Sequence, residues 1–569
     1  PRPVLASRLG RYAVTATTAG EENVGRASAA MAAGSIASRV LGVVRQSLIT
    51  LAIGQGLVAN AFTTANTLPN IIYLLIAGGV LNSVLVPQLV KASENPDGGR
   101  EYTDKLLTLA VGGLLAVTVA ATLAAGLLVR AYAQELTGSL LNLAVFFAVI
   151  TLPQIFFYGL YALLGQVLNT RGRFAAFGWA PAIANLVAII GLLAFMRLFQ
   201  GHVTAAEWTP EMVWWFAGTA TLSIVAQALI LLVPLWRSGF RWRPRFGVRG
   251  IGLAATSRVA GWALGALLVS QVSYLVASQV MWHATGSDEV AHGAGQVFIA
   301  GTTIYANAFL VFMVPHGLVT VSLVTAMYPR IARAARADDR PALTRDYARA
   351  LTLPAALTIP ASVALLVFAV PIMGLLFSSK DPAEIPAAGA ALACLAMGVL
   401  PFGVDIINQR VFYAFEAGRF AFTEQVIATL TATAVALGAV LARPEWAVPI
   451  IAIGVVLSAS AAAAYGMRRV RRFIGAYSAR AIVRTWVRML LASAGAGYVA
   501  WGVVIILTRA LAGFGRVGYA VILLVGGMIF AVVYLLVARL LRVEEIAVIA
   551  APVINRLDRR PPGRHRPRH

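Results

Sequence analysis

The chain has 569 residues, of which 59% are hydrophobic and 12% are charged, and its formal net charge is +23 at pH 7. Soluble domains carry about 25% charged residues, so this chain lacks the polar surface that a soluble protein of its length needs. Its positive charge is divided among short connections between apolar stretches, which argues against a nucleic-acid-binding protein. The composition therefore predicts an integral membrane protein.

Fourteen apolar stretches are each long enough to cross a bilayer, which takes about 20 residues in a helix. In chain order they cover residues 31–54, 67–90, 106–129, 139–168, 175–198, 211–235, 254–281, 296–327, 350–377, 386–412, 420–442, 447–467, 487–508 and 517–541. The sequence thus predicts an all-α integral membrane protein. We expect residues 1–30 to form a basic cytoplasmic segment without a signal peptide, and residues 542–569 to form a basic cytoplasmic tail.

Arginine residues gather in alternate connections. Residues 237–249, 330–349 and 468–488 are rich in Arg, whereas 54–66 and 283–293 contain neither Lys nor Arg. By the positive-inside rule the Arg-rich connections face the cytoplasm, and an even number of spans puts both termini on that side. We therefore expect a multi-pass protein of a bacterial cytoplasmic membrane with both termini in the cytoplasm.

Short motifs recur six spans apart. The sequence SRVLG at 38–42 matches SRVAG at 257–261, and RGRFA at 171–175 matches AGRFA at 417–421. Because six is even, the two halves share one orientation, as in parallel repeats related by an axis along the membrane normal. The predicted parts are an N-lobe of six spans, a basic linker, a C-lobe of six spans and two additional helices, at 31–235, 236–253, 254–467 and 487–541.

Two arginines lie within the first span, where a charge needs a partner or a cavity. Arg45 is about 21 Å along the helix from Met31 at 1.5 Å per residue, which is too deep for its side chain to reach water along its own helix. Both Arg39 and Arg45 are candidates for binding phosphate oxygens, which a guanidinium group can hold bidentately. The alternative is that they pair with backbone carbonyls or a carboxylate inside the bundle.

Other polar residues in the spans are candidates for lining a substrate cavity or are interhelical hydrogen-bonding groups. They are Gln46, Asn60, Asn70, Arg258, Gln271, Tyr305 and Asn307. Proline and glycine residues predict hinges in the second and eighth spans, with ordinary tolerance in membrane helices as the alternative. They are Pro69, Gly78, Gly79, Pro315 and Gly317.

Two carboxylates also lie within spans. Asp405 is a candidate cation site or salt-bridge partner, and we expect Glu424 to form a salt bridge with Arg410 or Arg419. HExxH, Walker, CxxC and GxSxG motifs are absent from the sequence. We therefore expect no enzyme, no metal site and no cofactor.

The motif ASRVLGVVR at 37–45, followed by NAF at 60–62, LPN at 68–70 and the turn at 167–174, resembles the MurJ (MviN) lipid II flippases. These belong to the multidrug/oligosaccharidyl-lipid/polysaccharide exporter superfamily. The resemblance implies two six-helix lobes around a cationic cavity built from spans one, two, seven and eight. It also implies a groove for a polyprenyl tail at spans thirteen and fourteen.

Within this resemblance the family's basic residues carry over to Arg39 and Arg45, while Gln46 and Asn60 stand where the family has acidic residues. The implied function is to move lipid II, the undecaprenyl-diphosphate-linked peptidoglycan precursor, from the inner to the outer leaflet by alternating access. The alternatives are a flippase for another polyprenyl-linked oligosaccharide and a transport-inactive cell-wall scaffold. The expected partners are lipid II or a similar polyprenyl-diphosphate lipid, membrane lipids, and cell-wall synthesis and division proteins.

Overall fold

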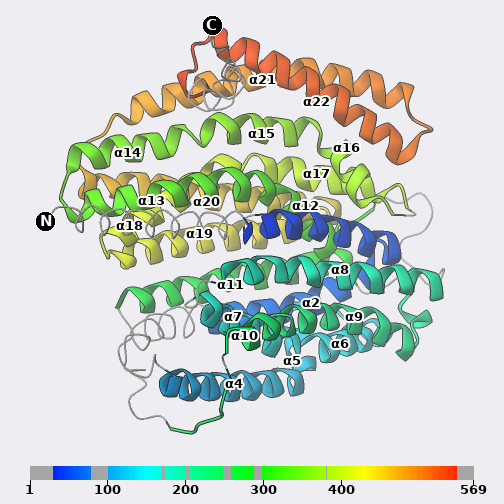
Figure 1. The fold of residues 1–569 in the computed structure, drawn as a ribbon. Coiled ribbons are helices and arrows are strands. Elements are labelled where there is room, and N and C mark those ends of the chain that lie inside the picture. The colour runs from blue at the N-terminus through cyan, green and yellow to red at the C-terminus, as the bar shows by residue number, and fades with distance from the viewer. Residues whose placement is uncertain are drawn as a thin grey trace, which may run out of the picture. The chain divides into compact units, whose positions relative to one another are not determined.

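The computed structural model describes residues 30–31, 33–77, 100–169, 173–199, 204–239, 241–247, 258–286, 298–379 and 381–546, and every regular element in them is helical (Figure 1). The chain divides into two compact units. Unit 1 contains residues 1–303 and 376–382, and unit 2 contains residues 304–375 and 383–569.

Unit 1 begins with a helix at Ala33–Ile53, which we name the first helix. The elements that follow it are α2 (Leu57–Ile76), α4 (Arg100–Leu123), α5 (Ala125–Tyr132), α6 (Gly138–Thr151), α7 (Gln154–Asn169), α8 (Phe174–Leu198), η2 (Ala205–Glu207), α9 (Pro210–Leu229), α10 (Leu232–Arg237) and α11 (Arg258–Thr285). The first residues of α12 (Thr302–Pro315) also belong to this unit.

Unit 2 takes the rest of α12 and the C-terminal half of the chain. Its further elements are η5 (His316–Thr320), α13 (Val321–Arg336), α14 (Arg340–Thr352), α15 (Ala355–Val367), α16 (Ala369–Phe377), α17 (Glu384–Ala396), α18 (Val399–Ala414), α19 (Gly418–Gly438), η6 (Ala439–Leu441), η7 (Pro444–Trp446), α20 (Ala447–Ile474), α21 (Ala479–Ala510) and α22 (Gly515–Leu540). The last two residues of α16 count with unit 1.

The predicted membrane spans agree with these helices in all but one case. Within the described part of the chain, 12 helical stretches are long and apolar enough to cross a membrane, and the number is 13 if the pair α17 and α18, bent by 43°, counts as one broken span. The second predicted span, 67–90, was placed too late, because α2 begins at Leu57, and residues 78–90 lie outside the described part. Polar residues between 60 and 67 lower the hydropathy of the first half of α2, although most of them are at least partly buried.

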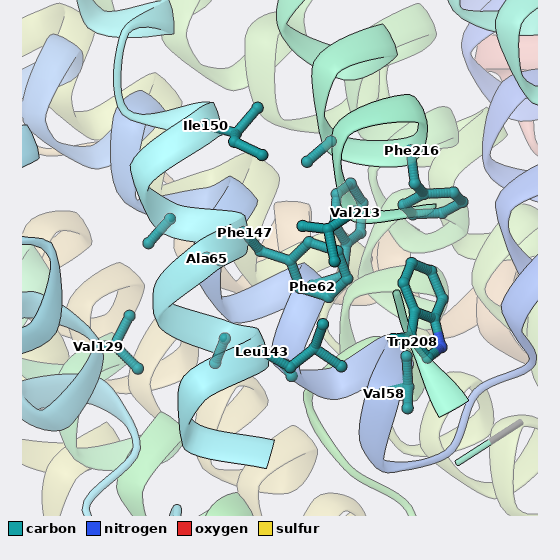
Figure 2. Close-up of a cluster of buried hydrophobic side chains, with 14 of the residues drawn as sticks. Val58, Phe62, Ala65, Val129, Leu143, Phe147, Ile150, Trp208, Val213 and Phe216 are labelled. Carbon is teal, nitrogen blue, oxygen red and sulfur yellow. The ribbon is translucent and has the colours of Figure 1, made fainter. Parts of the chain in front are cut away.

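Aromatic side chains hold the core of unit 1 together. The Phe62 ring on α2 packs edge-to-face against Phe147 on α6 at 5.4 Å and against Phe216 on α9 at 4.7 Å. Trp208 packs on Phe147 at 5.3 Å (Figure 2). Each such pair stabilises the fold by about 0.5–1.5 kcal/mol beyond the effect of burying the rings. These contacts therefore hold α2, α6 and α9 together.

The packing of α11 differs from the division that the sequence repeat predicts. α11 opens the predicted C-lobe, but it packs on α2 and α5 within unit 1. In unit 2, α20 packs on α18 and α19, and α21 packs on α15 and α22. The repeat describes sequence relatedness and the compact units describe packing, so the two divisions need not coincide.

Candidate functional site

The Arg45 side chain lines an internal cavity of unit 1. The cavity has a volume of about 30 Å³, and its polar lining consists of Arg45, Asn66, Gln154, Tyr158, Thr219 and Ser223, which come from the first helix, α2, α7 and α9. The Nε atom of Arg45 is buried and has no hydrogen-bond partner in the described part of the chain. The rest of the lining is apolar and consists of Ile49, Phe62, Ala188, Leu192, Phe216, Ala220 and Ile224. We name this cavity the Arg45 chamber; a cavity of this size can hold a water molecule or two.

A hydrogen-bond network fixes one wall of this chamber. The Gln154 amide on α7 donates to the Asn66 side-chain oxygen at 3.2 Å and to the Thr221 hydroxyl at 3.2 Å. The Thr221 hydroxyl in turn donates to the Ile150 carbonyl at 2.8 Å. Gln154 is therefore held by α2 and α9, whereas the Arg45 Nε atom has no hydrogen-bond partner in the described part of the chain.

Small residues position the first helix against α8. Gly34 and Gly178 lie so close together that a methyl group on either one would overlap the facing helix. The Asn185 amide on α8 donates to the Ser38 carbonyl at 2.8 Å. Elsewhere few residues of the first helix are buried, so this helix is the most loosely covered of the candidate spans in the described part.

The remaining candidates on the first helix, α2 and α11 lie apart from the Arg45 chamber. Arg39 and Asn70 are exposed, and Gln46 is half-buried. Gln271, half-buried on α11, donates to its neighbour Ser270 at 3.2 Å. Arg258 is the first residue of α11, and its side chain lies outside the described part.

Asn60 bridges α2 and the beginning of α12. Its side-chain oxygen accepts a hydrogen bond from the Thr303 backbone N–H at 2.9 Å, and the Thr302 hydroxyl donates to the Asn60 backbone carbonyl at 3.3 Å. Asn60 is only 2% exposed. Gly301 makes room for this contact, since a Cβ atom there would overlap the Asn60 side chain. The residue predicted to line a substrate cavity thus holds two helices together in this structure.

Further bonds join the same ends of these helices. The Thr63 and Thr303 hydroxyl groups lie 2.9 Å apart, and the Trp282 indole on α11 donates to Thr64 at 3.1 Å. We name this set of residues the latch; it comprises Asn60, Thr63, Thr64, Trp282, Thr302 and Thr303. The latch fastens α2 to α11 and α12 within unit 1.

The predicted hinges in the eighth span coincide with a change of helix type. Pro315 ends α12, and the next five residues, His316–Thr320, which include Gly317, form a π-helical turn. Such turns mark places where the regular hydrogen-bond ladder is interrupted. In the second span Pro69 is buried within α2, and Gly78 and Gly79 lie outside the described part.

Tyr305 and Asn307 lie on α12 within unit 2. Tyr305 is half-buried and stacks on Phe309, with 5.9 Å between ring centres. Asn307 is fully buried. Their predicted role in binding substrate remains a prediction.

The two carboxylates predicted within spans, Asp405 and Glu424, form no salt bridge with arginine in the described part of the chain. Glu424 makes no salt bridge with Arg410 or Arg419, and this part of our prediction was wrong. Arg410 lies over the Tyr328 ring and Arg419 over the Phe420 ring, and aromatic faces attract guanidinium groups. Asp405 accepts a hydrogen bond from Gln409 at 2.9 Å, and its other oxygen is buried without a partner.

An apolar groove of about 410 Å³ runs along unit 2. Its walls come from α15, α21 and the start of α18, and they are lined by Ile359, Ser362, Val363, Leu366, Met397, Leu400, Pro401, Val483, Trp486, Val487 and Leu490. α21 is the predicted thirteenth span. The residues of α22, which packs on α21, do not line this groove.

Sequence reasoning missed most of the residues around Arg45. Gln154 and Tyr158 are four residues apart on α7, and Thr219 and Ser223 are four apart on α9. Residues at this spacing lie on one helix face. Polar pairs four residues apart in otherwise apolar spans were thus a usable signal for this chamber.

Comparisons with known proteins agree with this architecture. A family model described as lipid II flippase MurJ matches residues 49–556. The probable lipid II flippase MurJ of Rhizobium meliloti (strain 1021) is 26% identical over 388 residues, which cover 65% of this chain and 66% of that protein, just under two thirds of its length. The probable lipid II flippase MurJ of Vibrio cholerae serotype O1 is 27% identical over 398 residues, covering 67% of this chain and 70% of that protein.

Solved structures show the same fold. A lipid II flippase MurJ in an inward closed conformation superposes with a TM-score of 0.68 at 16% identity, covering 92% of this chain and 99% of that one. An inward-facing multidrug resistance MATE family transporter of the MOP superfamily superposes with a TM-score of 0.62 at 17% identity, covering 79% and 96%. At these identities the likeness shows the fold alone.

Proposed function

Because this chain belongs to the lipid II flippase MurJ family, we propose that it carries lipid II from the inner to the outer leaflet of the bacterial cytoplasmic membrane. The family consists of multi-pass transporters rather than enzymes. Lipid II carries a diphosphate, a polar headgroup and a long polyprenyl tail. Moving that headgroup through hydrocarbon without a protein would leave many polar groups unsatisfied.

The observation that supports the proposal best is the state of Arg45. A guanidinium group within a membrane span is costly unless it meets an anion or a polar partner. The Arg45 Nε atom is buried without a partner and faces a chamber with room for only a water molecule or two. We infer that the loosely covered first helix moves during transport, so that Arg45 leaves this chamber and pairs with the diphosphate.

The latch supplies the second part of the mechanism. The sequence predicts that the connections without Lys or Arg, 54–66 and 283–293, face outside, and because α2 begins at Leu57, only residues 54–56 of the first range form a connection. The latch lies at the helix ends beside these connections, so it would close the outer end of the transport pathway. The latch consists of only a few hydrogen bonds, and these can break and re-form when rigid helices rock against each other. Opening of the latch would release the headgroup to the outer leaflet.

The apolar groove on unit 2 fits the tail of the same substrate. Its lining is almost entirely aliphatic or aromatic, as pockets for apolar ligands generally are. A polyprenyl chain bound there could remain in contact with lipid while the headgroup crosses. We propose the membrane potential or a monovalent cation as the energy source.

A depletion strain tests the function in cells. When this protein is depleted, lipid II should accumulate in the inner leaflet, and expression of the chain should restore its movement to the outer leaflet. If another polyprenyl-linked oligosaccharide accumulates instead while lipid II crosses normally, the substrate assignment is wrong. If depletion alters the leaflet distribution of neither lipid, the transport proposal is wrong and the alternative of a cell-wall scaffold is favoured.

A further inference from the structure

Glu424 is a carboxylate buried inside unit 2 without a charge partner. It lies on α19 between α18 and α20, and it is 0% exposed. Neither of its carboxylate oxygens has a hydrogen-bond partner of ordinary geometry in the described part of the chain. The function proposed above makes no use of this group.

The surrounding backbone is shaped to admit this side chain. Gly466 on α20 lies directly against it, and a Cβ atom at that position would overlap both the Glu424 carboxylate and the Asn408 amide. Asn408 is itself fixed, because it accepts a hydrogen bond from the Tyr347 hydroxyl at 2.7 Å and donates to the Ala463 carbonyl at 3.2 Å. The Asn408 amide is also close enough to the Glu424 carboxyl group to interact with it, but the contact lacks the geometry of an ordinary hydrogen bond.

Other ionisable groups near Glu424 do not compensate a negative charge there. On α18, Asp405 and Tyr413 are close enough for electrostatic interaction, and on α14 so is Tyr347. Asp405 would repel a second carboxylate.

The arginines of the adjoining helices do not neutralise it. Arg410 on α18 lies over the Tyr328 ring, Arg419 on α19 over Phe420 and Arg471 on α20 over Tyr477. An ionised carboxylate without a counter-charge would be strongly destabilising in such a site.

We propose that the Glu424 carboxyl group is a proton-binding site of unit 2, and that it carries a proton when α18, α19 and α20 are packed as they are here. A neutral carboxyl group removes both the cost of burial and the repulsion from Asp405. A proton needs no additional volume, whereas a metal cation requires several oxygen ligands around an open position. The direct contact with Gly466 leaves no such position beside the carboxylate.

The proton can exchange only when water reaches Glu424, which requires α19 and α20 to separate. Transport would then be linked to protonation of Glu424, a link that rests on the proposed function. The proton site itself does not, because it depends only on the packing of unit 2. An experiment can therefore disprove the proton site and its link to transport independently of each other.

Infrared spectroscopy of the purified full-length chain tests the proton site directly. A protonated carboxyl group has a carbonyl stretch that is separate from the bands of a carboxylate and shifts in D₂O. At neutral pH the wild-type protein should show this band, Glu424→Gln should lose it, and Asp405→Asn should retain it. Loss of the band in Asp405→Asn but not in Glu424→Gln would assign the proton to Asp405 and overturn the proposal, and so would its absence from the wild type.

The stability of the variants gives an independent test. Glutamine has nearly the shape of a neutral glutamic acid, so Glu424→Gln should fold and unfold at the wild-type temperature. If Glu424→Gln does not fold, the site needs a negative charge and the proposal is wrong.

A transport assay separates this inference from the proposed function. In proteoliposomes with an imposed pH gradient, the wild-type rate of lipid II movement should depend on the gradient, and that of Glu424→Gln should not. A rate that ignores the gradient in both, together with the infrared band, would keep the proton site and remove its link to transport. No lipid II movement by the wild type would count against the proposed function alone.

Discussion

The Asn60 side-chain oxygen and the Thr303 backbone N–H form a hydrogen bond of 2.9 Å that joins α2 to the first turn of α12. The first N–H groups of a helix have no partner within the helix, so Asn60 satisfies one of them from 243 residues away in the chain. The bond therefore stabilises the N-terminal end of α12 and fastens it to α2.

Replacing Asn60 by alanine should weaken this connection. We expect Asn60→Ala to lower the free energy of unfolding by about 1 kcal/mol, as the loss of a helix-capping side chain generally does. Thermal unfolding in detergent measures the change. Asn70→Ala on the exposed face of the same helix is the control and should change stability by less than about 0.5 kcal/mol. Equal effects of the two variants would show that the bond does not contribute.

Gly301→Ala should disturb the same contact from the other side. The new methyl group would overlap the Asn60 side chain, which is buried and hydrogen-bonded, so we expect a loss of about 1–3 kcal/mol. The double variant Asn60→Ala/Gly301→Ala should recover part of this loss, because alanine leaves room for the methyl group. Gly261→Ala on α11, where a Cβ atom meets open space, is the control. Strictly additive losses would contradict the predicted overlap.

Filling the apolar groove should impair binding of a polyprenyl lipid. Val487 lines the groove and is 46% exposed, so Val487→Trp should block the groove without disturbing the core. We expect lipid II to bind several-fold more weakly, as measured by native mass spectrometry. Val499→Trp, on the same helix and 44% exposed but outside the groove, should bind like the wild type. If Val487→Trp binds lipid II like the wild type, the polyprenyl tail does not occupy this groove.

The membrane topology can be tested by labelling of single cysteines. In a Cys394→Ala background, we expect Gln134→Cys to react with an impermeant thiol reagent added outside whole cells, and Ala337→Cys to react only after lysis. Both positions are exposed and lie in connections between spans. The opposite pattern would show that the positive-inside argument assigned the wrong side.

Hydropathy alone predicted the helices that lie in continuous apolar stretches, and it failed where the burial of polar residues mattered. The start of α2 was missed because Asn60, Thr63 and Thr64 look like loop residues, although hydrogen bonds to distant helices satisfy them. Those partners are more than 200 residues away. No local pattern could have indicated them.

The candidate site shows the same limit. The depth of Arg45 follows from the rise of a helix, but the direction of its side chain depends on how the first helix is rotated against α7 and α9. The predicted salt bridge of Glu424 was wrong for a related reason. Sequence proximity to Arg410 and Arg419 suggested a pair, but each arginine packs on an aromatic ring instead.

The central claim is that Arg45 holds the diphosphate of the transported lipid, and movement of labelled lipid II across proteoliposome membranes tests it most directly. We expect Arg45→Ala to reduce the rate at least tenfold at wild-type thermal stability, and Arg45→Lys to restore it only partly, because an ammonium group lacks the planar fork that holds two phosphate oxygens. Arg39→Ala, on the exposed face of the same helix, should be milder. A wild-type rate for Arg45→Ala would contradict the claim, and so would a loss explained entirely by unfolding.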